Sequence, residues 1–345
     1  MQPLRLIQVG MGNWGRDWMR NVIARSADVE AVAYVDPVPA MLEQVQQLGV
    51  DPDRCFSSLS AALAAVNTDA VLITASLPGH VPAAIDALQA GKHVLLEKPF
   101  APSVAEASDV ITAAQDRVLM ISQNYRFYPA VRAVADLIRQ QALGPVSAVD
   151  VQFRKYANTA PVEGHSHYTI VHPLLLDMAI HHFDLMRYVL NQEPTSIACH
   201  AWNPPWSKFR DPAAASATIT FDRGAVVSYQ GSWVSTAPQT TWAGAWRIEC
   251  EGGEIVWTSR NNMNTDADSV TIRPRGKRMQ RQPLPPMEQY DRAGSLAAFV
   301  QAIRTGHEPE TSGRDNIMTL ALTLAAVRAA ETEHVQAVSP PEYSM

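Results

Sequence analysis

Hydrophobic and polar positions in the first third of the chain follow two alternating patterns. Short apolar runs at residues 4–9, 29–36, 69–76, 92–99 and 118–127 are typical of buried strands, and segments with helical spacing, such as residues 79–91, separate them. Strands that alternate with helices predict right-handed crossovers and a doubly wound parallel sheet. We therefore expect an α/β domain over residues 1–123, with ligands bound at the carboxyl ends of its strands.

The pattern changes after Tyr125. One amphipathic helix, near residues 129–144, precedes short segments of alternating polarity at residues 146–156, 196–202, 215–222, 225–234, 246–252, 254–259 and 269–274. This alternation predicts a mostly antiparallel open sheet with one face on helices. We expect an α+β domain over residues 124–345, whose C-terminal helix is a candidate for packing back on the first domain.

Composition narrows the class of protein. The chain has 345 residues, enough for two cores, and its net charge of −6 gives no general attraction to nucleic acid or anionic lipid. One basic run, Arg273 to Arg281, is interpreted as a solvated hairpin rather than a phosphate site. Three widely spaced cysteines indicate reduced, buried thiols, and no segment resembles a signal peptide or a membrane span. We expect a soluble, cytoplasmic protein.

A glycine-rich turn joins the first strand to the first helix. Gly10, Gly12 and Gly15 form G-x-G-x-x-G, in which the first glycine permits the tight turn, the second admits a pyrophosphate and the third lets helix and strand pack closely. The helix N-terminus adds free N–H groups and the positive end of its dipole. The motif predicts a dinucleotide-binding Rossmann domain, and Asn13 and Trp14 inside the turn are expected cofactor contacts.

Asp36 ends the second strand, about 20 residues after Gly15, as in the dinucleotide-binding fingerprint. A carboxylate there can accept hydrogen bonds from the adenosine ribose and would repel a 2′-phosphate, so NAD is expected in preference to NADP. Other strand ends should meet in the same crevice. The expected cofactor-binding set is Gly10, Gly12, Asn13, Trp14, Gly15, Asp36, Ser76, Leu77, His80, Glu97, Lys98, Gln123 and Arg126.

Lys98 follows an apolar strand and precedes Pro99, which biases Lys98 away from helical conformation. A lysine fixed at the cofactor crevice can hydrogen-bond a substrate hydroxyl and stabilise the oxygen as it becomes alkoxide-like. The alternative interpretation is a solvated lysine at a strand end, which is the commoner position of lysines.

Residues 174–184 (LLLDMAIHHFD) carry ionisable groups within an apolar run. On an α-helix, Asp177, His181 and Asp184 share one face, while His182 lies roughly 100° around the axis. A buried carboxylate beside a histidine is costly unless both are paired, so this group is either a satisfied polar cluster or a reaction site. These residues alone leave both interpretations open.

The segments GMGNWG, DALQAGKHVLLEKP and DMAIHHFD, with the tail TSGRDNIMTLALTLAAVRAA, resemble the glucose–fructose oxidoreductase/inositol dehydrogenase (Gfo/Idh/MocA) family over nearly the whole chain. The resemblance implies an NAD(P)-dependent oxidoreductase of sugars or cyclitols with Lys98, Asp177 and His181 as its catalytic set. It also implies a homodimer or homotetramer formed through the open sheet. Ala179 replaces the usual glycine of the helix and Ser76–Leu77 replaces the usual Pro-Asn, but neither departure removes a catalytic group.

On this hypothesis His181 is the general base, because neutral imidazole can accept a proton near pH 7. Lys98 holds the oxygen as it becomes a carbonyl, and Asp177 positions the substrate or the imidazole. Asp184 is expected to anchor the helix, and His182 to pack or to touch substrate from the side. The nicotinamide carries the redox chemistry.

A polar loop rich in histidine and tyrosine, residues 155–172, precedes this helix, and loops of that length are often functional. A sugar needs many directional hydrogen bonds. The expected substrate-binding set is Lys98, Tyr125, Lys155, Tyr156, His165, Tyr168, His172, Asp177 and His181.

Two other functions are compatible with these residues. The histidines from His165 to His181, together with Asp177, could bind a divalent metal, although Lys98 would then have no role and our expectation is that no metal is used. A sensor that binds NAD or a sugar without chemistry is the second alternative. The joint presence of an amine, a carboxylate and a base argues against it.

Overall fold

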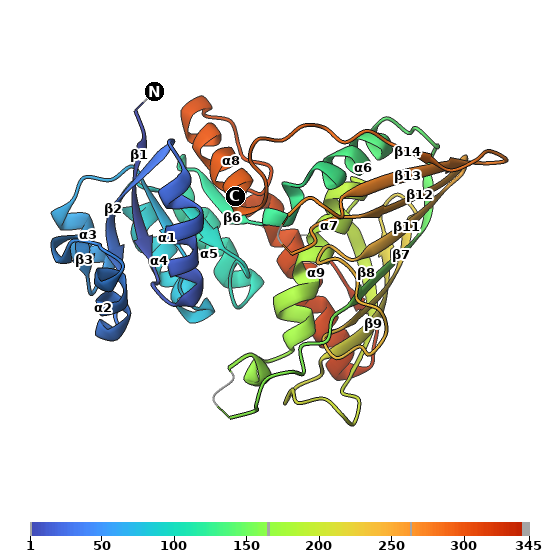
Figure 1. Ribbon diagram of the computed structural model, residues 1–345, viewed down its shortest axis with the longest axis horizontal. Coiled ribbons are helices and arrows are strands. Elements are labelled where there is room, and N and C mark those ends of the chain that lie inside the picture. Colours follow the sequence, from blue (N-terminus) through green and yellow to red (C-terminus); the bar gives the residue numbers. More distant parts are fainter. Residues whose placement is uncertain (1, 164–165, 263, 340–345) are drawn as a thin grey trace. The chain divides into compact units, whose positions relative to one another are not determined.

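The computed structural model describes residues 2–163, 166–262 and 264–339, which form two compact units (Figure 1). The first unit combines residues 2–124 with residues 292–317, and the second combines residues 125–291 with residues 318–339. The chain therefore passes from one unit to the other after Asn124, after Asp291 and after Ile317.

The first unit contains a parallel sheet in the order β3-β2-β1-β4-β5-β6 (Figure 1). Its strands are β1 (Leu4–Val9), β2 (Val29–Val35), β3 (Cys55–Phe56), β4 (Ala70–Ile73), β5 (His93–Glu97) and β6 (Leu119–Ser122). The strand order reverses between β1 and β4, which is the point where dinucleotides bind on such sheets. The predicted doubly wound sheet is confirmed.

Helices cover this sheet because its strands are apolar on both faces. Leu6, Ile7, Val71 and Leu95, on three of the strands, are fully buried, as in parallel sheets with helices on both sides. The helices are α1 (Asn13–Asn21), α2 (Pro39–Gln47), α3 (Leu59–Ala65), α4 (Leu77–Gln89), α5 (Val104–Ala114) and α8 (Asp291–Thr305).

The second unit contains a nine-stranded sheet in the order β14-β13-β12-β11-β7-β10-β9-β8-β15. Its strands are β7 (Val146–Arg154), β8 (Pro194–Trp202), β9 (Ala214–Phe221), β10 (Val226–Ser232), β11 (Ala245–Cys250), β12 (Gly253–Thr258), β13 (Ser269–Pro274), β14 (Gln280–Arg281) and β15 (Gln336–Ala337). Neighbouring strands are antiparallel except β7 and β10, which run parallel. The predicted mostly antiparallel sheet is confirmed.

The two faces of this sheet differ in polarity. Val149, Val151 and Phe153 of β7 are buried on one face, whereas Asp150 and Gln152 between them are exposed on the other. The helices of this unit include α6 (Pro129–Arg139), which packs on β12 and β13, α7 (Ile180–Leu190) and most of α9 (Gly313–Thr332). One face thus forms the core and the other is polar.

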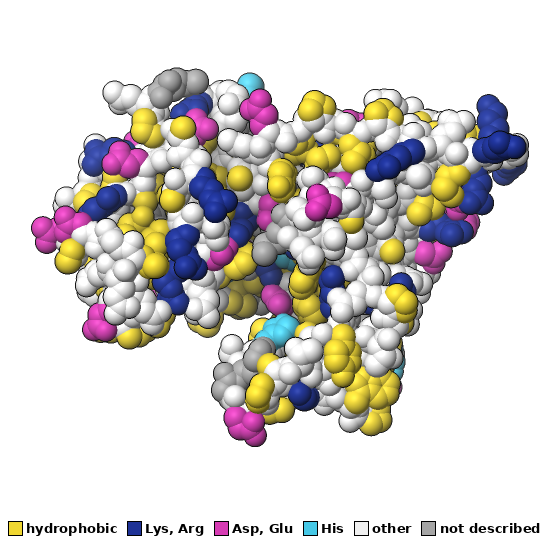
Figure 2. Space-filling view, in the orientation of Figure 1, with side chains coloured by type: hydrophobic (Ala, Val, Ile, Leu, Met, Phe, Trp, Pro, Cys, Tyr) yellow, Lys and Arg dark blue, Asp and Glu magenta, His cyan; other side chains and the backbone are white. Residues whose placement is uncertain are grey.

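The basic run lies on the β13–β14 hairpin, where Figure 2 shows dark-blue side chains gathered. Arg275, Lys277, Arg278 and Arg281 are all exposed. The prediction of a solvated hairpin is confirmed.

The cysteines Cys55, Cys199 and Cys250 are free, as predicted, but they are half-buried rather than buried. Burial raises the pKa of Cys199 to about 12 and that of Cys250 to about 11, so both remain protonated near neutral pH. Within the residues that the structure describes, no helix has both the length and the apolarity needed to cross a membrane.

Candidate active site

The three glycines of the glycine-rich turn differ in their steric surroundings. Gly10 has φ +91°, and a Cβ there would lie 2.3 Å from the backbone nitrogen of Ala75. A Cβ on Gly15 would lie 1.9 Å from the carbonyl oxygen of Gly10, whereas a Cβ on Gly12 would meet nothing within 4 Å. Packing of the chain itself therefore requires glycine at the first and third positions. The open space at the second position fits a pyrophosphate that approaches the N-terminus of α1.

Two polar side chains stabilise this turn by hydrogen bonds to its backbone carbonyl groups. No motif in the sequence indicates either of them. The hydroxyl of Thr74 donates to the carbonyl of Gly10 (2.7 Å), and the amide of Gln8 donates to the carbonyl of Gly15 (2.7 Å). Gln8 is fully buried, and a glutamine among the buried apolar residues Leu6, Ile7 and Val9 is the signal that could have revealed it.

Asp36 lies at the carboxyl end of β2 with its carboxylate oriented by backbone donors. One oxygen accepts from the N–H of Met11 (2.7 Å) and the other from the N–H of Val38 (2.9 Å). A carboxylate oxygen can accept more than one hydrogen bond, so both oxygens can also accept from ribose hydroxyls. The position and chemistry of Asp36 fit an NAD ribose.

Glu97 fixes the backbone from which Lys98 extends. Its carboxylate accepts from the indole N–H of Trp18 (2.7 Å) through one oxygen and from the backbone N–H of Lys98 (3.2 Å) through the other. Lys98 itself is half-buried at the carboxyl end of β5. Glu97 therefore supports the lysine, and Trp18, which no motif in the sequence indicates, supports Glu97 in turn.

His80 connects the segments that follow β4 and β5. It is buried, with Nδ1 2.8 Å from the carbonyl oxygen of Pro99 and Nε2 3.0 Å from that of Ala75. Burial lowers the pKa of His80, so the ring is neutral and donates to one carbonyl at a time. Next to it, Ser76 is exposed and Leu77 begins α4.

The exposed residues of the turn contact other parts of the first unit. Asn13 accepts from Arg16 through its side-chain oxygen (2.7 Å). Trp14 is 41% exposed, and the guanidinium carbon of Arg292 lies 4.3 Å from its ring centroid. No local pattern indicates Arg292, which lies far along the chain from the turn.

Gln123 and Arg126 follow β6 but differ in their surroundings. Gln123 is fully buried, and neither atom of its amide group has a hydrogen-bond partner within the described residues. Such an amide can pair with an amide of a ligand. Arg126 begins in the second unit, where its guanidinium binds both carboxylate oxygens of Asp184 (2.7 and 2.6 Å).

The helix that carries Asp177 and His181 is not a uniform α-helix, and the prediction of one α-helical face over residues 174–184 is wrong. Residues Pro173–Ala179 form a π-helix, and the α-helix α7 begins at Ile180. The side chain of Asp177 is 39% exposed, and its carboxylate lies 3.8 Å from Nε2 of His167. A π-helical turn changes the angular spacing of side chains and is frequent at functional sites.

His181 packs against an aromatic ring. Its imidazole is stacked on Tyr125, with centroids 4.1 Å apart and an angle of 5° between the planes. The hydroxyl of Tyr125 accepts from Arg260 (2.8 Å), and burial raises the pKa of Tyr125. Arg260 follows β12, and no motif in the sequence indicates it.

The two neighbours of His181 on α7 have structural contacts. The carboxylate of Asp184 binds Arg126 and accepts from Thr319 (3.0 Å), as expected of a residue that anchors the helix. His182 is fully buried between the hydroxyl of Tyr229 (3.1 Å) and the carbonyl of Trp242 (3.0 Å). Burial lowers the pKa of His182 to about 4, so this ring is neutral.

The loop before the π-helix places its predicted substrate ligands differently. Tyr168 is buried and its hydroxyl donates to the carbonyl of Ala157 (3.0 Å), so it holds the loop together. His172 lies 2.9 Å from Glu331, and Tyr156 is 40% exposed. His165 lies outside the described residues.

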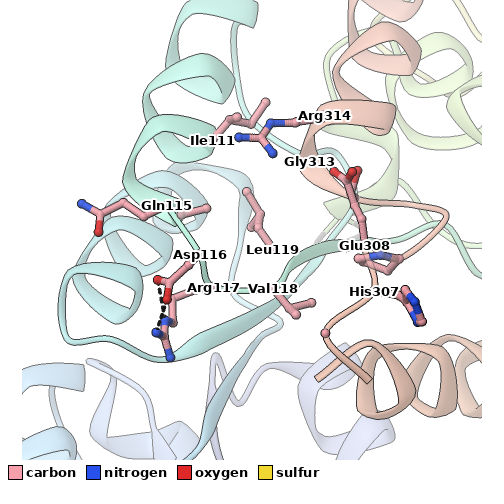
Figure 3. Close-up of a pocket in the computed structure, with 14 residues that line it drawn as sticks. Ile111, Gln115, Asp116, Arg117, Val118, Leu119, His307, Glu308, Gly313 and Arg314 are labelled. Carbon is pink, nitrogen blue, oxygen red and sulfur yellow. Dashed lines mark hydrogen bonds and ion pairs between the residues drawn. The ribbon is translucent and has the colours of Figure 1, made fainter. Parts of the chain in front are cut away.

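Two further features concern alternative sites. Among the described residues, no group of three or more His, Cys, Asp or Glu side chains is placed to hold a metal ion. A pocket of about 180 Å³ in the first unit (Figure 3) lies between the end of α5, the start of β6 and residues 306–314. It shares no lining residue with the sets predicted from the sequence.

Comparison with known proteins identifies the family of the chain. Residues 4–125 match the model of an oxidoreductase family with an NAD-binding Rossmann fold, and residues 131–256 match the GFO/IDH/MocA C-terminal domain. The class of protein is thus an NAD-binding oxidoreductase. The chain belongs to the Gfo/Idh/MocA family, and the resemblance and the cofactor predicted from the sequence are confirmed.

Individual relatives cover nearly the same length. Inositol 2-dehydrogenase of Rhizobium meliloti is 28% identical over 332 residues, 93% of this chain and 95% of that protein. 1,5-Anhydro-D-fructose reductase of Ensifer adhaerens is 26% identical over 287 residues, 81% and 82% of the two chains. The solved WlbA dehydrogenase of Bordetella pertussis, in complex with NADH and UDP-GlcNAcA, has a TM-score of 0.78 at 22% identity and covers 99% and 100%.

Proposed function

We propose that the protein is an NAD-dependent dehydrogenase that transfers a hydride between a secondary alcohol of a sugar, glycoside or cyclitol and the nicotinamide. The observation that carries this proposal is the arrangement of His181, a nearly buried imidazole stacked on Tyr125 in the family's C-terminal domain. In the NAD-binding domain, Lys98 extends from a backbone that Glu97 fixes at the carboxyl end of β5. Relatives named for inositol and anhydrofructose support the substrate class.

In the oxidation direction His181 accepts the proton of the substrate hydroxyl. The ammonium group of Lys98 donates a hydrogen bond to the same oxygen and stabilises the negative charge that develops on it. Bound NAD supplies the hydride acceptor. As the hydride leaves, the C–O bond becomes a carbonyl, and the proton remains on His181 until it passes to solvent.

Asp177 positions the reacting groups in this proposal. Its partly exposed carboxylate can accept a hydrogen bond from a second hydroxyl of the polyol, and its contact with His167 orients it. Gln123 would present its buried amide to the carboxamide of the nicotinamide, and Asp36 would accept from the adenosine ribose. Each of these roles uses a group whose chemistry matches the part of the ligand it meets.

The proposed roles of the base and the amine are tested with His181→Ala and Lys98→Met. We expect each to lower kcat by roughly 100-fold or more, the usual contribution of a positioned acid or base, while the Kd for NAD stays within a small factor. Substrates are first found with a panel of sugars, inositols and glycosides, by following NADH formation. Exposed Lys277→Met is the control for loss of one positive charge.

Three outcomes would contradict the proposal. Unchanged turnover in both variants would remove these residues from the mechanism. No NADH formation across a broad panel, with NAD still bound, would favour a sensor or an enzyme that recycles tightly held NAD. Loss of activity on chelation would indicate the metal-dependent alternative.

The proposal includes the oligomeric state and the cellular location of the protein. We expect a cytoplasmic homodimer or homotetramer formed through the polar face of the nine-stranded sheet, where Glu254 pairs with Arg247 (3.3 Å) and with Arg273 (3.2 Å). Sedimentation of the wild-type chain and of Val226→Glu, which adds a charge to an exposed position of β10, tests this expectation.

A further inference from the structure

Lys155 occupies a position that the register of β7 assigns to the core. Val149, Val151 and Phe153 are the inward-facing residues of β7, and Lys155 is the next residue with the same parity after the strand ends. Phe153 contacts the ring of His182, the immediate neighbour of His181. The lysine therefore leaves the sheet on the face that carries the candidate base, where an apolar side chain would be expected.

The ammonium group of Lys155 has no negative partner within the described residues. Only 9% of the residue surface is exposed, and Nζ lies 4.7 Å from the ring centroid of Trp242. A contact with an aromatic face stabilises a cation only partly, and a buried charge without a counter-ion is costly. Burial, followed by the charge of Arg260, lowers the pKa of Lys155, which is consistent with a site that lacks its anion.

The other cation of this region, Arg260, already has a negatively charged partner. Arg260 is buried, with Nε 3.7 Å from the carboxylate of Asp291, and it donates to Tyr125. Its guanidinium carbon lies 4.2 Å from the Tyr125 ring centroid and 5.9 Å from that of Trp242. A continuous set of contacts thus links Lys155, through Trp242, Arg260 and Tyr125, to His181, and Lys155 supplies the one uncompensated positive charge in it.

We propose that Lys155 binds a carboxylate of the substrate, so that the preferred substrates are acidic sugars such as uronates and aldonates. This inference rests on the proposed function and specifies its substrate class. A substrate carboxylate would provide the counter-ion that the fold omits, and a charge-assisted hydrogen bond to it would place the polyol carbons beside His181. A single uncompensated ammonium matches a monoanion better than a phosphate ester, which carries nearly two charges and is usually bound by several donors.

The test compares acids with their neutral counterparts. Initial rates of NADH formation are measured with D-galacturonate and D-gluconate, with D-galactose and D-glucose, and with D-glucose 6-phosphate. The proteins are the wild type, Lys155→Met, Lys155→Arg and the control Lys277→Met. Calorimetry on the NAD-bound enzyme measures affinity for the same compounds independently of turnover.

We expect the wild type to prefer the acids over the neutral sugars and over the phosphate ester. Lys155→Met should raise KM and Kd for the acids by about 10- to 100-fold, the usual effect of removing a hydrogen bond to a charged group, with a smaller change in kcat. Its constants for neutral sugars should change several-fold less than those for the acids, since no charge is paired there. Lys155→Arg should restore part of the preference, and Lys277→Met should match the wild type.

Several results would overturn the inference. Equal loss for acids and neutral sugars in Lys155→Met would assign the lysine a packing role, and a preference for the phosphate ester would assign it to another anion. Lysine-dependent binding of acids without any NADH formation would preserve the inference while the proposed function fails. Oxidation of neutral sugars without binding of any acid would preserve the function and refute the inference.

Discussion

The imidazole of His181 lies flat on the ring of Tyr125, with the two planes 5° apart and the centroids separated by 4.1 Å. This contact uses the face of the imidazole, so it fixes the ring plane through a surface that takes no part in proton transfer. Arg260 in turn fixes the tyrosine through its hydroxyl. The orientation of the candidate base therefore depends on a neighbour without acid–base function.

Removal of the aromatic face should impair catalysis more than removal of the hydroxyl. We expect Tyr125→Leu to lower kcat by about 10-fold, because an aromatic contact of this kind contributes up to about 1.5 kcal/mol. Tyr125→Phe retains the stack and should stay within a few-fold of the wild type. The pH profile of kcat should shift in the leucine variant only. Equal losses in the two variants would show that the hydrogen bond to Arg260, not the stack, is what matters.

The glycines of the turn allow folding and cofactor binding to be tested separately. Gly12→Ala should leave the stability nearly unchanged, because its Cβ would meet nothing within 4 Å, but it should weaken NAD binding by filling the space for the pyrophosphate. Gly15→Ala should destabilise the domain, because its Cβ would lie 1.9 Å from the carbonyl oxygen of Gly10. Thermal unfolding and NAD titration distinguish them. A Gly12 variant with normal NAD affinity would place the pyrophosphate elsewhere.

Asp36 should determine the choice between NAD and NADP. Asp36→Ser removes the carboxylate that would repel a 2′-phosphate, so the ratio of kcat/KM for NAD over NADP should fall by about 10-fold or more. Exposed Asp53→Ser is the matched control and should leave the ratio unchanged. An unchanged ratio in the Asp36 variant would exclude this carboxylate from cofactor discrimination.

Local patterns in the sequence were sufficient to predict the strands and helices of the scaffold. The strand, turn and helix around Gly10 and the alternation along β7 each depend on neighbours within a few residues, and both were predicted correctly. The π-helix at Pro173–Ala179 was not, because apolar periodicity cannot distinguish a π-turn from an α-turn over one or two turns. The contact of Asp177 with His167 joins this π-helix to the preceding loop, and no local pattern predicts it.

Contacts between residues far apart in the sequence were the second feature that could not be predicted. Arg126 lies near a strand end, as cofactor ligands do, but a carboxylate on α7 binds its guanidinium. Arg260 and Trp242 reach the surroundings of Tyr125 from far along the chain, and no local pattern indicates either. Lys155 was predicted to bind a sugar through a hydrogen bond. The lack of a counter-ion beside it can be recognised only when its neighbours in space are known.

The pair formed by Arg126 and Asp184 should be a major contributor to stability. Both side chains are almost fully buried, so Asp184→Ala leaves an uncompensated guanidinium in the interior and should lower the free energy of unfolding by roughly 3–5 kcal/mol. Asp136→Ala breaks the exposed pair with Arg139 and should cost less than about 1 kcal/mol. Urea denaturation measures both. Similar small losses would mean that water or a rearranged partner compensates Arg126.

His182 should make the second unit less stable in acid. Its folded pKa of about 4 lies below the ordinary value of 6.5, because burial excludes the charged form. Between these two values the unfolded chain binds a proton that the folded chain does not, so the free energy of unfolding falls as pH drops from 6.5 to 4, by up to about 3 kcal/mol. His182→Gln keeps a donor for Trp242 and an acceptor for Tyr229 but does not titrate, so its stability should fall less steeply in this window.

Exposed His307→Gln should retain the wild-type slope. Parallel slopes for wild type and His182→Gln in urea denaturation between pH 4 and pH 6.5 would show that the buried ring does not contribute to acid sensitivity.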